Sequence, residues 1–309
     1  MQPDTLFWIA SQTKPITATA LMMLVEESKV HLDDPAEDYL PLLKDPWVIA
    51  EQDDSHRLLI KADRKVTVRD LLNHTSGLPF KSGMEEPTLD SLPLSEAVRS
   101  YAMTPLQSQP GTRYDYSNIG INIAGRIIEV VSGMPYETFM QQHLFDPLGM
   151  TDTTFWPTAE QTRRLAKSYR PNAARDGFDA FPISQLTYPL DNRLTRYPMP
   201  AGGLFSTAPD VIRFCQMILN GGKVGPTTYL SEASIAEMTR KQTGGSIEES
   251  YGLGWGVGAG SFGHGGAQAT NMSIHPARGL ITTFLVQHEG YLLDGDKSQE
   301  AFIAAALTE

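Results

Sequence analysis

The sequence has very little cysteine and no excess of positive charge. Cys215 is the single cysteine among 309 residues, so a disulfide bond within the chain is excluded. The cysteine count therefore does not separate an oxidising compartment from a reducing one. Only 25 lysines and arginines stand against 36 aspartates and glutamates, which gives a net charge of −11. Because an acidic chain repels nucleic acids and anionic lipids, we expect neither as a partner.

Long hydrophobic runs are also missing. The longest apolar stretch, residues 18–25, is too short to span a bilayer, and no basic segment followed by an apolar one marks a signal peptide. We expect a soluble chain without a membrane segment, cytoplasmic, or periplasmic if a leader has been removed. Hydrophobic residues make up 41% of the chain, enough for a sizeable core. The sequence does not indicate an oligomeric state.

Helical patterns fill the middle of the chain and strand patterns its last third. We predict a buried helix from Ser11 to about residue 29, a capping box at residues 67–70, and helices at 118–133, from Pro135 to before Pro147, at 207–221 and at 298–307. Strands are predicted at 251–258, 270–275 and 280–287. Residues 170–200 carry five prolines and no clear period, which favours an irregular wall of an active-site cleft. These elements suggest an α+β fold.

The first chemical motif is Ser11-Gln12-Thr13-Lys14. Residues three apart on a helix share a face, so the Ser11 hydroxyl is expected beside the Lys14 amine. A serine hydroxyl becomes a good nucleophile when a neighbouring base takes its proton. The apolar flanks predict that Lys14 is buried, and burial disfavours the charged ammonium. Taken alone, the same spacing also fits an ordinary helix cap on the surface.

Two further motifs carry polar groups of the same chemistry. Tyr116-Ser117-Asn118 precedes a predicted helix. A tyrosine near a lysine ammonium could favour its phenolate and act as a base, and Asn118 could hold the lysine and a substrate carbonyl. Alternatively, Ser117 or Asn118 is simply a helix N-cap.

The third motif is residues 262–267, between two predicted strands. Its glycines let a substrate approach the backbone, and a backbone N–H at its end could join that of Ser11 in an oxyanion hole.

In this order and spacing, the three motifs resemble those of serine β-lactamases and penicillin-binding proteins, in particular class C-like serine hydrolases with their esterase and DD-peptidase relatives. The resemblance extends to further segments: Leu71–Pro79, Pro110–Arg113, Pro147–Met150 and Gly202–Leu204. It covers the chain almost from end to end. It implies a β-lactamase/transpeptidase-like α+β fold, with an antiparallel sheet flanked by helices and a mostly helical subdomain.

The resemblance also assigns roles to residues. It implies that Ser11 is the acylated nucleophile, that Lys14 and Tyr116 share the proton transfers, and that Asn118 orients Lys14 and the substrate. The oxyanion hole would be formed by the N–H groups of Ser11 and Ala267. Substrate would lie along His264, Gly265, Gly266 and Ala267. The substrate would be a small ester, an amide or a β-lactam, and neither a cofactor nor a metal is implied.

One catalytic domain over residues 1–309 is expected, with an α/β part at roughly 1–30 and 200–309 and a helical part at roughly 31–199. Relatives place a helix and two strands before the nucleophile helix, whereas ten residues precede Ser11 here, so these strands are expected to be missing. His264 stands where β-lactamases carry lysine. Because histidine is mostly neutral at pH 7, it favours esters or peptides over β-lactams, although some DD-peptidases also carry histidine.

Other functions fit the sequence less well. No serine lies in the Gly-x-Ser-x-Gly elbow of an α/β-hydrolase. Residues 258–263 match a dinucleotide-binding glycine pattern but precede a strand, not a helix. The seven histidines include no His-x-x-x-His pair, which disfavours a metal hydrolase. A binding protein that kept the fold and lost activity, or a catalytically weak penicillin-binding protein, remains an alternative that a covalent serine probe would test.

Overall fold

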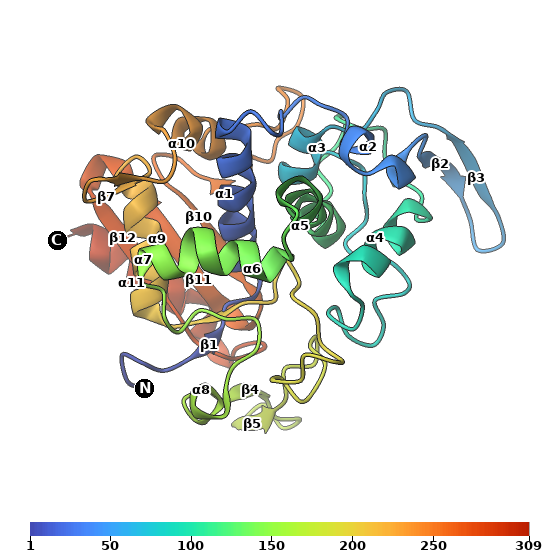
Figure 1. The fold of residues 1–309 in the computed structure, drawn as a ribbon. Coiled ribbons are helices and arrows are strands. Elements are labelled where there is room, and N and C mark those ends of the chain that lie inside the picture. The colour runs from blue at the N-terminus through green and yellow to red at the C-terminus, as the bar shows by residue number, and fades with distance from the viewer. Residues whose placement is uncertain (309) are drawn as a thin grey trace.

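A four-stranded antiparallel sheet, in the order β12–β11–β10–β9, forms one side of the computed structural model, which describes residues 1–308 (Figure 1). Its strands are β9 (Gly256–Val257), β10 (Phe262–Gly266), β11 (Thr270–His275) and β12 (Leu280–Phe284). The predictions at 270–275 and 280–287 are confirmed, the second with an earlier end. The strand predicted at 251–258 shrinks to β9, because Gly254 has a φ of +77° and Gly252 N–H bonds to the Trp255 carbonyl in a turn.

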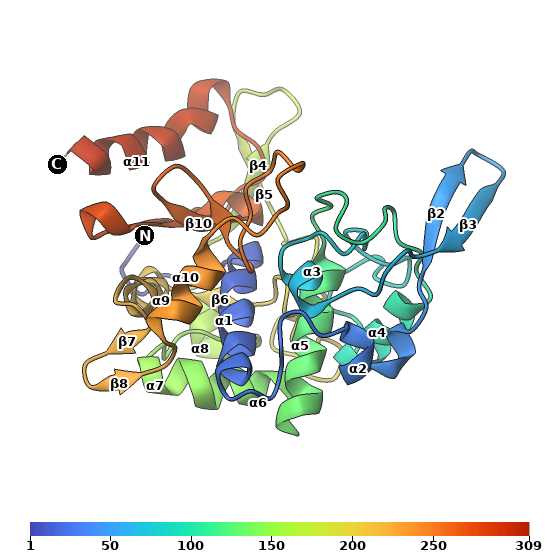
Figure 2. The same cartoon turned by 90° about the horizontal axis from the view of Figure 1, so that it is seen from above.

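Helix α1 (Thr13–Glu26) stands in the middle of the molecule (Figures 1 and 2). It packs against α5 (Asn118–Ser132) and α6 (Tyr136–Met140), while α9 (Ala208–Leu219) packs on β11 and β12. Neighbours on several sides explain why α1 is apolar nearly all round and almost wholly buried. The helices predicted from Ser11, Asn118 and residue 207 are therefore confirmed. Gly133 ends α5 with a φ of +72°, as a C-cap glycine does.

The remaining helices and strands complete an α+β fold. The α-helices are α2 (Ala36–Tyr39), α3 (Val68–Leu72), α4 (Leu94–Ala102), α7 (Asp146–Leu148), α8 (Ala159–Arg163), α10 (Glu232–Thr239) and α11 (Ser298–Thr308). Short helical turns form η1 (Ala10–Gln12), η2 (Pro41–Leu43), η5 (Pro276–Arg278) and η6 (Leu293–Lys297). The strand pairs are β1 (Phe7–Trp8) with β6 (Phe205–Ser206), β2 (Trp47–Gln52) with β3 (Arg57–Lys61), β4 (Ser168–Pro171) with β5 (Phe178–Phe181), and β7 (Lys223–Val224) with β8 (Thr227–Thr228). Thr67 and Asp70 form the predicted capping box. Within residues 1–308, no helix has the length and apolarity to cross a bilayer.

Two details of the middle segment differ from prediction. The helix that begins after Pro135 does not end before Pro147: a widened turn at Gln141–Phe145 leads into α7, which contains Pro147 and ends at Gly149. The wide turn accommodates a residue that has no N–H to donate. Residues 170–200 are not irregular throughout, because the β4–β5 hairpin extends into them.

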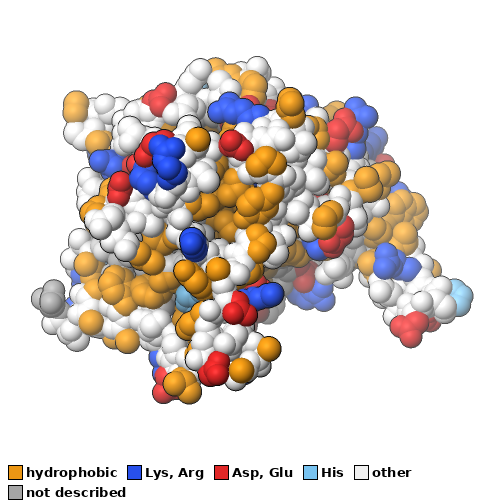
Figure 3. All heavy atoms as spheres, turned by 90° about the horizontal axis from the view of Figure 1, so that it is seen from below, with side chains coloured by type: hydrophobic (Ala, Val, Ile, Leu, Met, Phe, Trp, Pro, Cys, Tyr) orange, Lys and Arg blue, Asp and Glu red, His pale blue; other side chains and the backbone are white. Residues whose placement is uncertain are grey.

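One face of the molecule mixes the two signs of charge. On the face shown in Figure 3, basic and acidic side chains are interspersed among hydrophobic ones. The β2–β3 hairpin projects from the rest of the molecule (Figure 2).

A buried ion pair anchors the segment that leads to β6. Arg196 Nε lies 2.5 Å from an Asp90 carboxylate oxygen, and both side chains are fully buried. Arg196 also donates to the carbonyls of Leu190 at 3.0 Å and Gly203 at 3.2 Å. Asp90 in turn accepts the Thr187 N–H at 2.8 Å. The pair thus fixes the chain around residues 187–203, next to α1.

We expect Arg196→Met to lower the free energy of unfolding by about 3–5 kcal/mol, because it leaves the buried Asp90 carboxylate without its partner. Urea denaturation of the purified variant measures the loss. Arg99→Met is the matched control, since Arg99 and Glu96 form a largely exposed pair whose removal changes stability by less than about 1 kcal/mol. Equal effects of the two substitutions would contradict an anchoring role for Arg196.

Candidate active site

Ser11 lies in η1, at the junction between β1 and α1. Strand β1 is held by β6, and the Ile9 N–H bonds to the Leu204 carbonyl at 3.0 Å. Ala10, directly before the serine, has a φ of +46°, a strained value for a residue with a Cβ. The Thr13 hydroxyl donates to the Ala10 carbonyl at 2.6 Å. The backbone on both sides of Ser11 is therefore fixed by hydrogen bonds.

Lys14 lies one turn further along and is completely buried. Its Nζ is 3.0 Å from Ser11 Oγ, 2.7 Å from Asn118 Oδ1 and 2.8 Å from the Ala201 carbonyl. Two of these three partners can only accept a hydrogen bond. Nζ can donate to Asn118 and Ala201 in either protonation state, and its third direction faces the Ser11 hydroxyl, where a neutral amine presents its lone pair.

Burial lowers the pKa of Lys14 well below its ordinary value. No carboxylate is among the hydrogen-bond partners of Nζ in the described chain. The ammonium therefore loses hydration without gaining an opposite charge, which favours the neutral amine. The three hydrogen-bond partners would suit either form of the amine, so it is burial that favours the neutral one.

Tyr116 packs beside Lys14 and Ser11. Lys14 Nζ lies 4.7 Å from the centre of the Tyr116 ring. Burial raises the pKa of Tyr116 to about 12, and a hydrogen bond with Ser11 offsets only part of this rise. The prediction that a lysine ammonium favours the phenolate is thus wrong in direction. Because Lys14 tends to be neutral, little charge is available to stabilise a phenolate, and Tyr116 is a phenol at neutral pH.

The sequence left open whether Ser117 and Asn118 cap a helix or hold the lysine, and each residue takes one of these two roles. The Ser117 hydroxyl accepts the Gly120 N–H at 3.1 Å and is the N-cap of α5. Asn118, the first residue of α5, uses its side chain to hold Lys14. The first side chain of α5 therefore contacts Lys14 directly.

Strand β10 brings the glycines of the third motif against the nucleophile segment. A Cβ on Gly266 would lie 2.4 Å from the Ile9 carbonyl oxygen and 2.3 Å from Thr270 Oγ1, so only glycine fits there. Gly265 is exposed. Ala267 begins η4, the short helix (Ala267–Ala269) that contacts η1. The close approach at Gly266 thus places the start of η4 beside Ser11.

His264 lies partly buried on the same strand and is held by a tyrosine that the sequence analysis did not single out. His264 Nδ1 is 2.5 Å from the Gly265 carbonyl, and Nε2 is 2.8 Å from the Tyr251 hydroxyl. Since a carbonyl only accepts, the proton lies on Nδ1, and Tyr251 donates to Nε2. Burial is the largest of the effects that lower the pKa of His264 to about 3. The ring is neutral, and both nitrogens are used within the protein.

A cavity of about 430 Å³ opens beside these groups. Its lining includes Tyr116, Tyr251, His264, Gly265 and Asn271. The lining contains neither Ser11 nor Lys14, so this cavity lies on the His264 side of the site, and a cleft wall at residues 170–200 stays a prediction. Within residues 1–308, no three histidine, cysteine or acidic side chains are grouped to hold a metal ion.

The structure therefore brings together all the residues that the sequence analysis selected: a serine, a buried lysine, a phenol and an amide at one end of α1 and α5, and the glycine strand beside them. The sequence analysis missed Ala201 and Tyr251. Ala201 acts through its carbonyl, which carries no side-chain signal. Tyr251 is the first residue of the segment that was predicted as a strand. Nothing in that local sequence indicates that its hydroxyl bonds to His264.

Comparisons with known proteins agree with this arrangement. The β-lactamase family model matches residues 1–306. Protein Rv1367c of Mycobacterium tuberculosis is 33% identical over 325 aligned residues, which cover 93% of this chain and 79% of that protein. A protein of Escherichia coli K12 that carries the name of a D-alanyl-D-alanine carboxypeptidase is 29% identical, with 82% of this chain and 59% of that protein covered.

Among solved structures, simvastatin synthase (LovD) of Aspergillus terreus superposes with a TM-score of 0.83 at 22% sequence identity, over 99% of this chain and 84% of the other. At that identity the likeness shows the fold, which is the β-lactamase/transpeptidase-like fold that the sequence predicted. From the extent of the family match together with the serine, lysine and tyrosine at one site, we conclude that the chain belongs to the β-lactamase family and is a serine hydrolase.

Proposed function

We propose that this protein is a carboxylesterase that cleaves small esters through an acyl-enzyme at Ser11. The observation that carries the proposal is the set of three hydrogen-bond partners around a fully buried Lys14, whose pKa burial lowers. A neutral amine 3.0 Å from the serine hydroxyl is a general base in position before substrate arrives.

The proposed reaction has two halves. As Ser11 Oγ attacks the ester carbonyl, its proton moves to Lys14, and the carbonyl oxygen becomes an oxyanion beside the N–H groups of Ser11 and Ala267. The intermediate collapses, the alkoxide leaves, and the Tyr116 phenol gives it a proton that the Lys14 ammonium can replace. Water then attacks the acyl-enzyme along the same path and releases the acid and free Ser11.

The state of His264 favours an uncharged substrate. A β-lactam or a peptide C-terminus presents a carboxylate, which binds best to a fixed positive charge. His264 is neutral, and its two nitrogens already bind Gly265 and Tyr251. A simple ester needs no such partner. A DD-peptidase is the second candidate, supported by the name of the Escherichia coli relative.

The first prediction is that Ser11 alone is acylated. Treatment with a fluorophosphonate should add one adduct to the intact mass, and peptide mapping should place it on Ser11. Ser11→Ala should remove both the adduct and the esterase activity, while Ser76→Ala, at another buried serine, is a control for labelling. An adduct on another residue together with an active Ser11→Ala variant would exclude the proposed nucleophile.

The second prediction concerns the two proton-transfer groups. Lys14→Ala and Tyr116→Phe should each lower kcat by roughly 10²-fold or more, and the double variant should lose much less than the product of the two. Because the active amine is neutral, kcat/KM should fall on the acid side as Lys14 takes up a proton, at a pH far below the ordinary lysine pKa. A Tyr116→Phe variant within a few-fold of wild type would show that Tyr116 only packs.

The third prediction is that esters are turned over faster than β-lactams. At equal enzyme concentration, kcat/KM for p-nitrophenyl butyrate should exceed that for a chromogenic cephalosporin. His264→Lys should shift the ratio towards the carboxylate-bearing substrate by about 10-fold, and His264→Gln, which adds no charge, should not. Efficient cephalosporin turnover by the wild-type protein, above its rate on the butyrate ester, would refute this interpretation of His264.

A further inference from the structure

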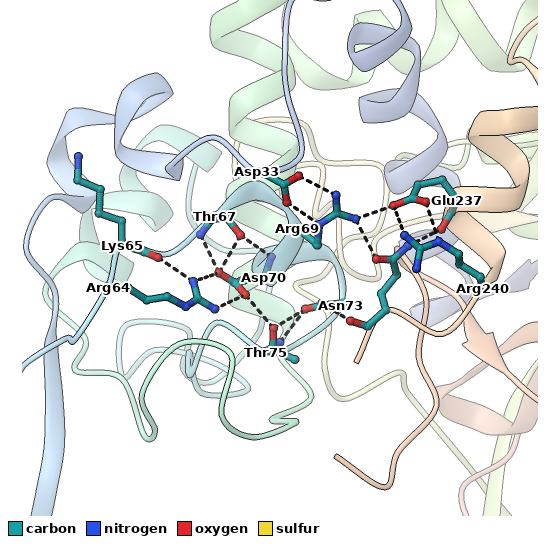
Figure 4. Close-up of polar contacts among 11 residues, drawn as sticks. Asp33, Arg64, Lys65, Thr67, Arg69, Asp70, Asn73, Thr75, Glu237 and Arg240 are labelled. Carbon is teal, nitrogen blue, oxygen red and sulfur yellow. Dashed lines mark hydrogen bonds and ion pairs between the residues drawn. The ribbon is translucent and has the colours of Figure 1, made fainter. Parts of the chain in front are cut away.

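The turn that follows α3, formed by residues 73–77, lies outside the proposed catalytic set and is unusually well anchored (Figure 4). The Asp70 carboxylate accepts two hydrogen bonds from Arg64, at 2.6 and 2.8 Å, and one from the Thr75 hydroxyl at 3.0 Å. Asn73 Oδ1 accepts both the N–H and the hydroxyl of Thr75, at 3.0 and 2.7 Å. These contacts hold the turn on either side of His74.

His74 contacts the backbone on both sides of Tyr116. Its carbonyl accepts the Asp115 N–H at 2.8 Å, and its Nδ1 accepts the Ser117 N–H at 3.2 Å. The ring centre lies 4.6 Å from that of Tyr116. Two hydrogen bonds to flanking peptide groups, with a ring against the side chain between them, restrict both the position and the tilt of the phenol.

Both the backbone conformation and the protonation state of His74 are energetically unfavourable, and packing alone explains neither. Its φ is +62°, in the left-handed region that a residue with a Cβ seldom adopts. Because Nδ1 accepts a hydrogen bond, the proton lies on Nε2, and that buried atom has no hydrogen-bond partner among the described residues. Burial lowers the pKa of His74 well below its ordinary value, so the acceptor is kept. A phenylalanine would fill the same space without a buried, unpartnered N–H, but it has no acceptor for the Ser117 N–H.

The same turn also holds the other side of the site. Asn73 Nδ2 donates to the Gln242 carbonyl at 3.3 Å, and the Gln242 N–H donates to the Tyr251 carbonyl at 2.8 Å. The Gln242 side chain accepts from Arg69, which also pairs with Glu237 of α10. The His74 ring centre lies 4.7 Å from that of Tyr251, whose hydroxyl fixes His264. The turn at residues 73–77 therefore contacts both Tyr116 and the Tyr251–His264 pair.

We propose that His74 is a positioning residue that sets the place of the Tyr116 phenol relative to Ser11 and Lys14. The inference rests on the proposed function, since it gives Tyr116 a part in proton transfer. His74 does not touch the nucleophile in this account. It acts through the peptide groups of Asp115 and Ser117, and of its two side-chain contacts the Nδ1 acceptor contributes more than the ring.

The test compares variants that separate the acceptor from the ring. His74→Phe keeps an aromatic ring and loses the acceptor. His74→Asn loses the ring but keeps an acceptor at the corresponding atom and tolerates a positive φ. His74→Gly removes both and relieves the backbone strain, which provides a foldable variant without the acceptor if the phenylalanine variant does not fold. Each is measured for kcat and KM with p-nitrophenyl butyrate, for the rate of fluorophosphonate acylation, and for its unfolding midpoint, alone and combined with Tyr116→Phe.

We expect the phenylalanine and glycine variants to lose about 10- to 100-fold in kcat and in acylation rate with little change in KM, and the asparagine variant to stay within a few-fold of wild type. In the Tyr116→Phe background the same substitutions should have almost no further effect. An equal loss in both backgrounds, or full acylation by a folded variant without the acceptor, would overturn the role of His74. A wild-type protein that is not acylated at Ser11 would instead overturn the proposed function, and with it this inference.

Discussion

The burial of Lys14 is the constraint on which the rest of the site depends. A lysine amine without water and without a carboxylate can be accommodated only as a neutral group or with every N–H bonded. The chain supplies Asn118 Oδ1 and the Ala201 carbonyl as acceptors and leaves the third direction to Ser11. The two acceptors stabilise the buried amine, and the same arrangement places it where it can take the proton of the Ser11 hydroxyl.

Meeting this requirement brings distant parts of the chain together. Ser11 and Lys14 come from the start of α1, Asn118 from the start of α5, and Ala201 from the segment fixed by Arg196 and Asp90. The helix ends suit the task, because a side chain at a first turn reaches out from a rigid element. Strand β10 closes the arrangement where Gly266 allows the backbone to come within contact of Ile9.

Much of this could be predicted from the sequence, because the signals are local. Ser11 and Lys14 are one helical turn apart, and the capping box at Thr67 and the αL glycine at Gly133 mark helix ends directly. The three motifs in order then indicated the fold. The protonation of Tyr116 and His264 could not be predicted, because it depends on burial produced by segments far away in sequence. Tyr251 was missed for the same reason, because its role depends on its contact with His264 Nε2. His74 lies in a segment that carries the resemblance, but nothing in the sequence indicated its contacts with the backbone beside Tyr116.

The π-type turn before Pro147 and the β4–β5 hairpin show a second limit. The hairpin lies in a stretch without clear periodicity, and the turn lies at the end of a predicted helix, where Pro147 suggested an interruption. In each case neighbouring structure stabilises a local geometry that the residues permit but do not require.

The central claim is that Lys14 is uncharged in the folded protein near neutral pH. A titration of ¹³Cε-labelled lysine by NMR, with the Lys14 signal assigned from a Lys14→Met variant, tests it directly. The account predicts one lysine signal that has the shift of a neutral amine at pH 8 and changes only at lower pH. A Lys14 signal that stays in the ammonium position up to pH 10, where ordinary lysines titrate, would contradict it.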